Sequence, residues 1–556
     1  MVSGCVTARR VLWVLVFLGF AVNYMIRINI NIAIVAMVRA PKGKDGAAPL
    51  VGQCQRAENA AVAVNNSAAK SFPNKTEVHH AGPPARPGCF RTADALAATT
   101  TALWDLTTTG PAPAGEQDEG FDWDERQQGL VLGAFFWLHW VMQVPGGILA
   151  RRYGTKLVFG LANLIPVLLT LAVPAVAYWD YRALLAVRFL QGLVAGFAWP
   201  SMHYMTAQWI PPNERSKFVT AYLGSSVGAA LTFPLCGQLI HTWGWESVFY
   251  VCGALGVAWY VLWLALVFDS PAKHPRISPE ELTYITESLG KSVSQKKIAT
   301  PWRAILTSRA VWMNIVAQWG GVFGLFTLMT QAPTYFRYIH GWNIRMTGLL
   351  SGLPHLMRML FAWVFSELGD YLLRKGLLSR TNVRKLATFF CDVVQGLLIL
   401  FLTFSGCNAI AAIVFLTAAT AAHGSVSTGP LASIVDISPN FCSIILGISG
   451  MISVLPGFIS PIIVSQLTFQ NQTVEQWQKV FGMTAAQLIV CGVLYCLFAQ
   501  SELQPWNSPG TSAASGTDDK NGSRNGVSRA SLPAIVISGS AHELQPLNGK
   551  GEMTRL

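Results

Sequence analysis

The chain has 556 residues, of which 52% are hydrophobic and only 12% carry a formal charge. Soluble domains carry about 25% charged residues, so this composition excludes a soluble globular protein and indicates a polytopic membrane protein. The net charge is +12, but the basic residues lie in short stretches between apolar runs. The positive-inside rule explains that distribution without a nucleic-acid partner.

The first apolar run covers residues 11–38, enough to cross a bilayer as a helix, which takes about 20 residues. Asn23, Arg27 and Asn31 lie four residues apart and form one polar stripe along that helix. A charge inside a membrane span is costly and faces a protein interior or an aqueous cavity. We therefore expect Arg27 to bind an anionic substrate. The alternatives are that Arg27 snorkels to an interface or pairs with a buried carboxylate.

Eleven further apolar windows are long enough to span a membrane, so the sequence predicts an all-α membrane protein with twelve transmembrane helices. These windows cover residues 128–149, 155–178, 182–208, 217–241, 247–268, 311–336, 347–369, 385–405, 408–433, 441–466 and 479–500. The expected organisation is a short cytoplasmic amino terminus (1–10), a six-helix half (11–268), a cytoplasmic linker (269–310), a second six-helix half (311–500) and a disordered cytoplasmic tail (501–556).

Basic residues gather at alternate connections between the windows, which places that face in the cytoplasm. Examples are Arg151 with Arg152 after the second window and Arg374 with Lys375 after the eighth. The opposite connections are short and nearly uncharged, except the first, residues 39–127, which we call the first outer loop.

We expect the first outer loop to be glycosylated, because sequons begin at Asn65 and Asn74. A third sequon begins at Asn471, in the last connection on the same side. Cys54 and Cys89 also lie in this loop and are candidates for a disulfide, although spacing alone does not determine the pairing. The other eight cysteines are expected to lie at the amino terminus or within apolar runs and to pack there as small hydrophobic side chains.

The chain ends in Thr554, Arg555 and Leu556. This pattern can add as a strand to a PDZ-type partner, and an ordinary tail end is the alternative. The sequence contains no CxxC pair, no HExxH motif and no evident nucleophile–base pair, so we predict no metal site, no cofactor and no enzymatic activity.

The two halves share a local pattern: glycine at a helix end and clustered cations follow both the second and the eighth window. Two six-helix halves with a repeated loop are typical of the major facilitator fold. Several further motifs occur in order along residues 11–506: Asn23-Tyr24-Met25-Ile26-Arg27, Phe135-Phe136-Trp137, Gln143-Val144-Pro145-Gly146-Gly147, Arg188-Phe189-Leu190-Gln191-Gly192, Leu353-Pro354-His355 and Asp436-Ile437-Ser438-Pro439.

On these motifs the chain resembles the anion/cation symporters (solute carrier 17 type) of the major facilitator superfamily. That family includes sialin, the vesicular glutamate transporters and the type I sodium–phosphate cotransporters. The likeness extends in particular to arthropod members described as inorganic phosphate cotransporters.

The resemblance implies secondary active transport of an anion by alternating access. It assigns Arg27 to the negative group of the substrate, and a guanidinium offers a planar fork for a carboxylate or a phosphate. Arg188 opens the fourth span and is either a cavity residue or an interfacial anchor. His203 and His355 match family histidines, which are either proton carriers or packed structural side chains.

Three positions depart from the family pattern. Ala195 replaces the fourth-span glutamate of proton-coupled members, Leu132 replaces a second-span histidine of the glutamate transporters, and Gly321 replaces their second substrate arginine. These departures argue against vesicular glutamate loading and against a sialin-like proton mechanism. Asp392, deep in the ninth span, is the candidate replacement for the missing carboxylate.

We therefore predict a plasma-membrane carrier in the lipid bilayer for a small anion, either inorganic phosphate or an organic anion, co-transported with Na⁺ or H⁺. Gln318 and Tyr335 of the seventh span are expected to line its path. The competing hypothesis is a non-transporting scaffold or receptor that retains the fold. The missing fourth-span glutamate favours that hypothesis, and the retained Arg27 argues against it.

Overall fold

The computed structural model describes residues 7–39, 53–54, 120–211, 214, 218, 220–293 and 300–507. The described part contains helices and no β-strand, apart from an isolated bridge between Val38 and Phe121. The predictions for Asn65, Asn74, Cys89 and residues 554–556 concern positions outside this description.

The amino-terminal half contains six membrane-crossing segments, of which five are helical stretches long and apolar enough to span a membrane. Its elements are α1 (Ala8–Met37), α4 (Glu125–Ala134), α5 (Gln143–Tyr153), α6 (Thr155–Trp179), α7 (Tyr181–Ala195), α8 (Ala198–Trp209), η2 (Thr220–Leu223), α10 (Gly224–Trp243) and α11 (Glu246–Leu266).

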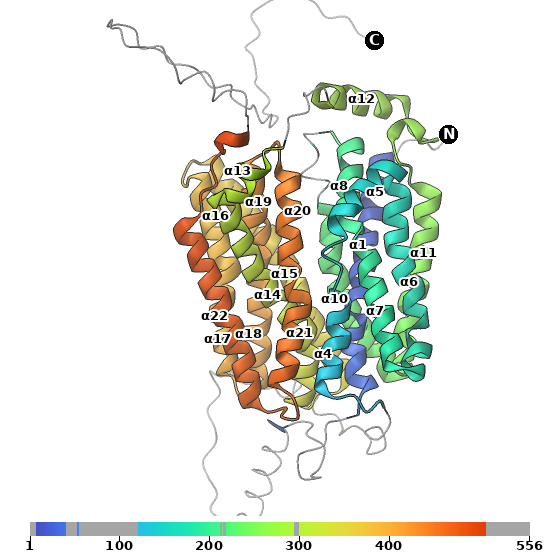
Figure 1. The fold of residues 1–556 in the computed structure, drawn as a ribbon, viewed down its shortest axis with the longest axis vertical. Coiled ribbons are helices and arrows are strands. Elements are labelled where there is room, and N and C mark those ends of the chain that lie inside the picture. Colours follow the sequence, from blue (N-terminus) through green and yellow to red (C-terminus); the bar gives the residue numbers. More distant parts are fainter. Residues whose placement is uncertain are drawn as a thin grey trace, which may run out of the picture. The chain divides into compact units, whose positions relative to one another are not determined.

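The carboxy-terminal half contributes six more stretches of this kind. The linker carries η3 (Pro271–Lys273), α12 (Pro279–Val293) and α13 (Trp302–Thr307). The half itself comprises α14 (Arg309–Tyr338), α15 (Ile344–Arg374), α16 (Arg380–Thr388), the π-turn η4 (Phe389–Val394), α17 (Gln395–Thr403), α18 (Ala409–Ala422), η5 (His423–Ser427), α19 (Pro430–Ile437), α20 (Cys442–Ser453), α21 (Pro456–Leu467), α22 (Val474–Phe498) and η6 (Pro505–Asn507). Figure 1 shows α14 to α22 gathered beside the elements of the first half.

The second membrane segment is broken, whereas the sequence predicts one continuous helix there. Helices α4 and α5 are separated by turns over residues 135–142. There the amide of Phe136 donates to the carbonyl of Gly133 at 2.9 Å, three residues back, whereas an α-helical amide would donate to the carbonyl four residues back. Helix α7 packs directly against this break, because a Cβ on Gly192 would lie 1.6 Å from the carbonyl oxygen of Phe135. Together with the eleven stretches named above, this segment completes the predicted twelve.

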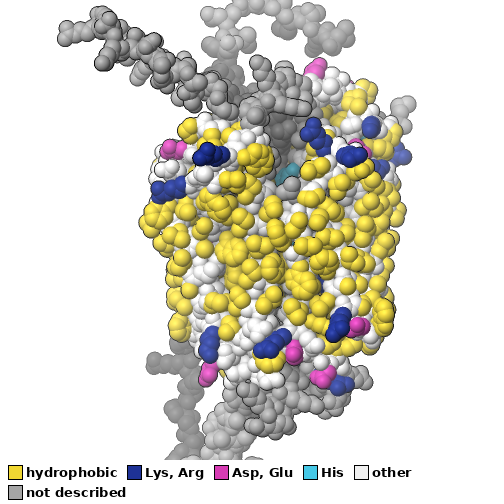
Figure 2. All heavy atoms as spheres, viewed as in Figure 1, with side chains coloured by type: hydrophobic (Ala, Val, Ile, Leu, Met, Phe, Trp, Pro, Cys, Tyr) yellow, Lys and Arg dark blue, Asp and Glu magenta, His cyan; other side chains and the backbone are white. Residues whose placement is uncertain are grey.

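The outer surface of the helices is apolar around the middle of the molecule. Large side chains such as Leu168, Trp363, Val414 and Leu497 are between 49% and 66% exposed, although a soluble protein would bury most side chains of this kind. Figure 2 shows a broad band of hydrophobic side chains, with Lys, Arg, Asp and Glu above and below it. This band is the surface that faces lipid.

The two halves are packed against each other at the end of the helices opposite α12. A Cβ on Gly348 of α15 would lie 2.5 Å from the carbonyl oxygen of Phe233 of α10, so these two backbones meet at a glycine. The amide of Gln470 donates to the carboxylate of Glu125 at 3.2 Å across the same end. At the α12 end, Figure 2 shows the surface hollowed between the halves, with a histidine in the hollow. The positive-inside rule makes the hollowed end cytoplasmic.

The linker helix α12 is attached to the first half through the start of α1. The carboxylate of Glu281 accepts hydrogen bonds from the amides of Ala8 (3.0 Å) and Arg9 (3.3 Å) and from Nε of Arg9 (2.9 Å). Arg9 also pairs with Glu214. Glu281 thus caps a helix that lies 272 residues away in sequence.

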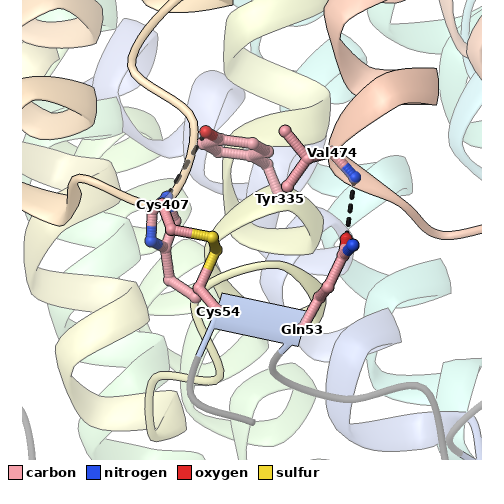
Figure 3. The surroundings of a disulfide bond; sticks show 6 residues. Gln53, Cys54, Tyr335, Cys407 and Val474 are labelled. Carbon is pink, nitrogen blue, oxygen red and sulfur yellow. Dashed lines mark hydrogen bonds between the residues drawn. A yellow bond between two sulfur atoms is a disulfide. The ribbon is translucent and has the colours of Figure 1, made fainter. Parts of the chain in front are cut away.

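A disulfide joins Cys54 of the first outer loop to Cys407, between α17 and α18 (Figure 3). The prediction that Cys54 pairs with Cys89 is therefore wrong. The amide of Cys54 donates to the carbonyl of Ile339 at 3.1 Å, and Gln53 accepts from the amide of Val474 at 2.9 Å. These contacts fasten part of the first outer loop to the carboxy-terminal half. Cys407 lies in the short gap between two apolar windows, not within a span.

Candidate functional site

The polar stripe of α1 faces the protein interior. Asn23, Arg27 and Asn31 are each at most 4% exposed. Asn23 donates to the side chain of Asn163 on α6 at 3.1 Å, and Asn31 donates to the carbonyl of Met329 on α14 at 3.3 Å. The stripe therefore contacts both halves of the molecule, with Arg27 between its two asparagines.

Arg27 is a buried cation without a carboxylate partner among the described residues, whose three ion pairs involve other side chains. Its guanidinium carbon lies 4.7 Å from the ring centre of Tyr24, 5.3 Å from Phe135 and 5.6 Å from Phe136. Its Nε has no hydrogen-bond partner in the described structure. Both alternatives, an interfacial anchor and a buried ion pair, disagree with this geometry. The arrangement leaves donor capacity and positive charge for an anion.

His139, which sequence reasoning did not single out, holds the guanidinium of Arg27. Its Nδ1 lies 3.0 Å from the carbonyl oxygen of Gly192, and because a carbonyl only accepts, Nδ1 carries a proton. In the neutral ring, Nε2 then accepts from a terminal nitrogen of Arg27 at 3.3 Å. The broken second segment thus supplies a positioning residue for Arg27.

Arg188 is hydrogen-bonded to the backbone of α1 at Arg27. It is 1% exposed and donates to the carbonyls of Ile26 (3.5 Å) and Arg27 (3.3 Å) and to the side chain of Gln191 (2.9 Å). Gln191 in turn donates to the hydroxyl of Thr170 at 2.9 Å. Arg188 therefore lies in the interior next to the candidate site, and its hydrogen bonds indicate a supporting role; it is no interfacial anchor.

Arg358 on α15 supplies a second cation from the other half. Its Nε donates to Nδ1 of His423 at 3.1 Å, and a terminal nitrogen donates to the hydroxyl of Ser226 on α10 at 3.4 Å. The side chain of Tyr24 interacts electrostatically with both Arg27 and Arg358. Each half thus contributes one guanidinium group: Arg27 from α1, which lies over the ring of Tyr24, and Arg358 from α15.

The remaining predicted site residues lie elsewhere. Gln318 donates to the side chain of Asn314 at 2.8 Å. Asn314 in turn donates to the carbonyl of Pro430, the first residue of α19. Tyr335 packs on Trp477 near the disulfide (Figure 3).

The three candidates for ion coupling occupy different environments. His203 contacts the hydroxyl of Tyr222 at 3.4 Å, and His355 stacks on Phe233. Asp392 lies in η4 and is completely buried. Asn471, the described sequon residue, is partly buried in the connection between α21 and α22.

A family model described as Major Facilitator Superfamily matches residues 95–461. The chain is similar to vesicular glutamate transporter 2 of Mus musculus, with 38% identity over 395 residues that cover 70% of this chain and 67% of that protein. It is also similar to vesicular glutamate transporter 1 of Bos taurus, with 38% identity over 400 residues, 71% of each chain.

Solved structures share the fold at low sequence identity. A bacterial homolog of the human lysosomal transporter Spinster matches with a TM-score of 0.58 and 13% identity, covering 90% of this chain and all of that one. A D-xylose–proton symporter matches with a TM-score of 0.56 and 12% identity, covering 89% and 99%. These likenesses concern the fold alone.

Proposed function

Because this chain belongs to the anion/cation symporter family of the major facilitator superfamily, we propose that it carries small anions across the membrane by alternating access. The substrate is inorganic phosphate or an organic anion, and its movement is coupled to Na⁺ or H⁺. The observation that carries this proposal is Arg27, a buried guanidinium that is held by a neutral histidine and has no carboxylate partner in the described part of the chain.

The energetics of Arg27 support an anionic substrate. An uncompensated buried charge costs several kcal/mol, and an oppositely charged group in good hydrogen-bonding geometry offsets that cost. A phosphate or carboxylate that reaches Arg27 would supply such a group through charge-assisted hydrogen bonds. Arg358 would add a second positive charge from the other half, so that a bound anion draws both halves toward it.

The packing of the two halves supports alternating access. They meet near Gly348 and near Gln470 at one end, whereas the surface between them is hollowed at the end that carries α12 (Figure 2). Rocking of the halves about the midplane would exchange the closed and open ends.

The identity of the anion is the finer part of this proposal. The relatives are named for glutamate, but the family resemblance places Gly321 at the position of their second substrate arginine and Leu132 at the position of a second-span histidine. We therefore propose a smaller anion than glutamate, with phosphate first. The sequence predicts the plasma membrane, whereas the relatives' names refer to vesicles and do not support that preference. Imaging of the tagged protein beside surface and vesicle markers would decide the compartment.

The test is uptake by proteoliposomes that contain the purified protein. Labelled phosphate, a labelled monocarboxylate and labelled glutamate are each offered with an imposed Na⁺ or pH gradient. Wild-type protein is expected to show saturable phosphate uptake, and Arg27→Ala is expected to lower it at least about 30-fold, the equivalent of about 2 kcal/mol. Arg10→Ala, on the exposed start of the same helix, is the matched control.

Equal uptake by Arg27→Ala and wild type would contradict the assignment of Arg27. If folded wild-type protein carried no anion of the panel under either gradient, the scaffold hypothesis would replace the carrier.

A further inference from the structure

Asp392 is a buried acid without a visible partner. It lies in the π-turn η4, is 0% exposed, and neither carboxylate oxygen has a hydrogen-bond partner among the described residues. An ionised carboxylate in such a place costs several kcal/mol unless a proton or a nearby positive charge compensates it. A short π-helical segment inside an α-helix often marks a functional site.

Asp392 and His423 both lie against the space that a side chain on Gly321 would have to share with them. A Cβ on Gly321 of α14 would lie 2.9 Å from Oδ1 of Asp392 and 3.3 Å from Nε2 of His423. Nε2 of His423 also has no hydrogen-bond partner in the described structure. An unpartnered acid and an unpartnered imidazole nitrogen thus border the position that the missing side chain would occupy.

The orientation of His423 links this space to Arg358. Nδ1 of His423 lies 3.1 Å from Nε of Arg358, and because a guanidinium only donates, Nδ1 is the acceptor. In the neutral ring the proton is then on Nε2, the nitrogen that faces the space beside Gly321. His423 therefore contacts a guanidinium on one side and turns its other nitrogen toward the position beside Gly321 where the Asp392 carboxylate also lies. Arg358 reaches α10 of the opposite half through Ser226.

We propose that Asp392, His423 and Arg358 form a proton-coupling site in which protonation of Asp392 releases the charge of Arg358 for the transported anion. This inference rests on the proposed function. With Asp392 ionised, its negative charge compensates Arg358 through the neutral imidazole. When the carboxylate takes up a proton, it becomes a neutral acid, His423 keeps its own proton, and the positive charge of Arg358 is left for an anion. Because the two equilibria are linked, a bound anion raises the proton affinity of Asp392 by the same factor by which protonation of Asp392 raises the affinity for the anion.

The chemistry around Asp392 favours a proton over Na⁺. Alkali cations prefer several oxygen ligands, whereas thiols and imidazole suit softer metals. The side chains bordering the space include the thiol of Cys391, 3.1 Å from the same Cβ position, and the imidazole of His423. Among the described residues no group of three or more His, Cys, Asp or Glu side chains could hold a metal ion.

Among the titratable groups near Asp392, His423 is the one that contacts Arg358, a side chain with a permanent charge. Helix α18 has no titratable residue, and α14 presents the glycines Gly320 and Gly321 to Asp392. Lys385 of α16 interacts with Cys496, whose thiol points to the Lys385 carbonyl. The titratable or charged side chains around the cluster, from η4, α22, η5, α15 and α1, are Cys391, Cys491, Cys496, His423, His355, Arg358 and Tyr24.

Two transport modes of the reconstituted protein separate coupling from anion binding. In the first, an acid-outside pH gradient drives accumulation of labelled phosphate, or of the panel anion that wild type carries. In the second, the same labelled anion exchanges for unlabelled anion at equal pH. Asp392→Asn, which mimics the neutral acid, is expected to lower gradient-driven accumulation at least tenfold and to lower exchange no more than about threefold. Asp370→Asn, on the exposed cytoplasmic end of α15, is the matched control and should retain both modes.

A second variant covers the case in which Asp392→Asn does not fold, as judged by gel filtration. His423→Phe removes the imidazole and should also abolish gradient-driven accumulation. Proton uptake on addition of the anion to purified protein, followed with a pH indicator, should be present in wild type and absent in both variants. Accumulation and proton uptake at wild-type levels in Asp392→Asn or His423→Phe would overturn the proposal, while loss of transport in Arg27→Ala would still support the carrier. Absence of any flux in wild type would instead refute the proposed function.

Discussion

The attachment of the linker helix α12 gives a stability prediction that can be worked from the structure. Glu281 is 6% exposed at its side chain, its partner Arg9 is 19% exposed, and its carboxylate also accepts two amide hydrogen bonds. Thr7, the N-cap residue of α1, makes no side-chain capping bond. Glu281→Ala would therefore leave two helix-end amides without their acceptor and would remove one of the two carboxylates that pair with Arg9.

The expected loss of unfolding free energy is about 2–4 kcal/mol. This figure combines a partly buried ion pair, which is worth more than an exposed pair and less than a fully buried one, with the two capping hydrogen bonds. For a unit the size of one half, about 2–4 °C accompanies each kcal/mol, so the apparent Tm in detergent should fall by roughly 5–15 °C at a fixed scan rate. Glu280→Ala, at an exposed position of the same turn, should change it little. A Tm of Glu281→Ala within 1 °C of that control would refute the reasoning.

Three further predictions concern the outer side and the Arg27 site. A nonreducing peptide map should join Cys54 to Cys407, and replacing both with serine should lower the unfolding free energy by about 2 kcal/mol; a map that joins Cys54 to another cysteine would contradict the structure. Burial lowers the pKa of His340 to about 4, so the folded state binds fewer protons than the unfolded state. The folded protein therefore keeps its full stability above pH 6.5 and loses about 2 kcal/mol of unfolding free energy when the pH falls to 5. The wild-type Tm should therefore drop more between pH 7 and pH 5 than that of His340→Phe, and equal drops would count against this assignment. His139→Leu should raise the KM for the anion about tenfold, because a hydrogen bond to a charged group is worth about 1.5 kcal/mol, whereas His139→Gln should restore it to within about threefold; a KM unchanged in His139→Leu would remove the positioning role.

The membrane fold could be predicted from the sequence because its physical constraint is strong. A membrane span needs a long apolar run whatever its neighbours are, and a charge within such a run must avoid lipid. Both rules act within one helix, so they identified the windows and the inward direction of Arg27. They did not show the break at residues 135–142, because aromatic residues there are as apolar as those of a continuous helix.

The missed residues depend on contacts between helices. His139 reaches Arg27 only because the second segment is broken and α7 approaches at Gly192. Arg358 is a charge inside an apolar window, so the rule that selected Arg27 could also have selected it. Cys407 could have been recognised from its place in an outer gap between two windows, but its pairing with Cys54 requires the folded structure.

The central claim is that Arg27 binds the transported anion, and equilibrium binding tests it most directly. Labelled phosphate, or the panel anion that wild type carries, is titrated into purified wild-type protein and into Arg27→Gln at fixed pH and ionic strength. The account predicts saturable binding to wild type and a Kd at least about 30-fold higher for Arg27→Gln. The same Kd for both proteins, with both folded, would contradict it.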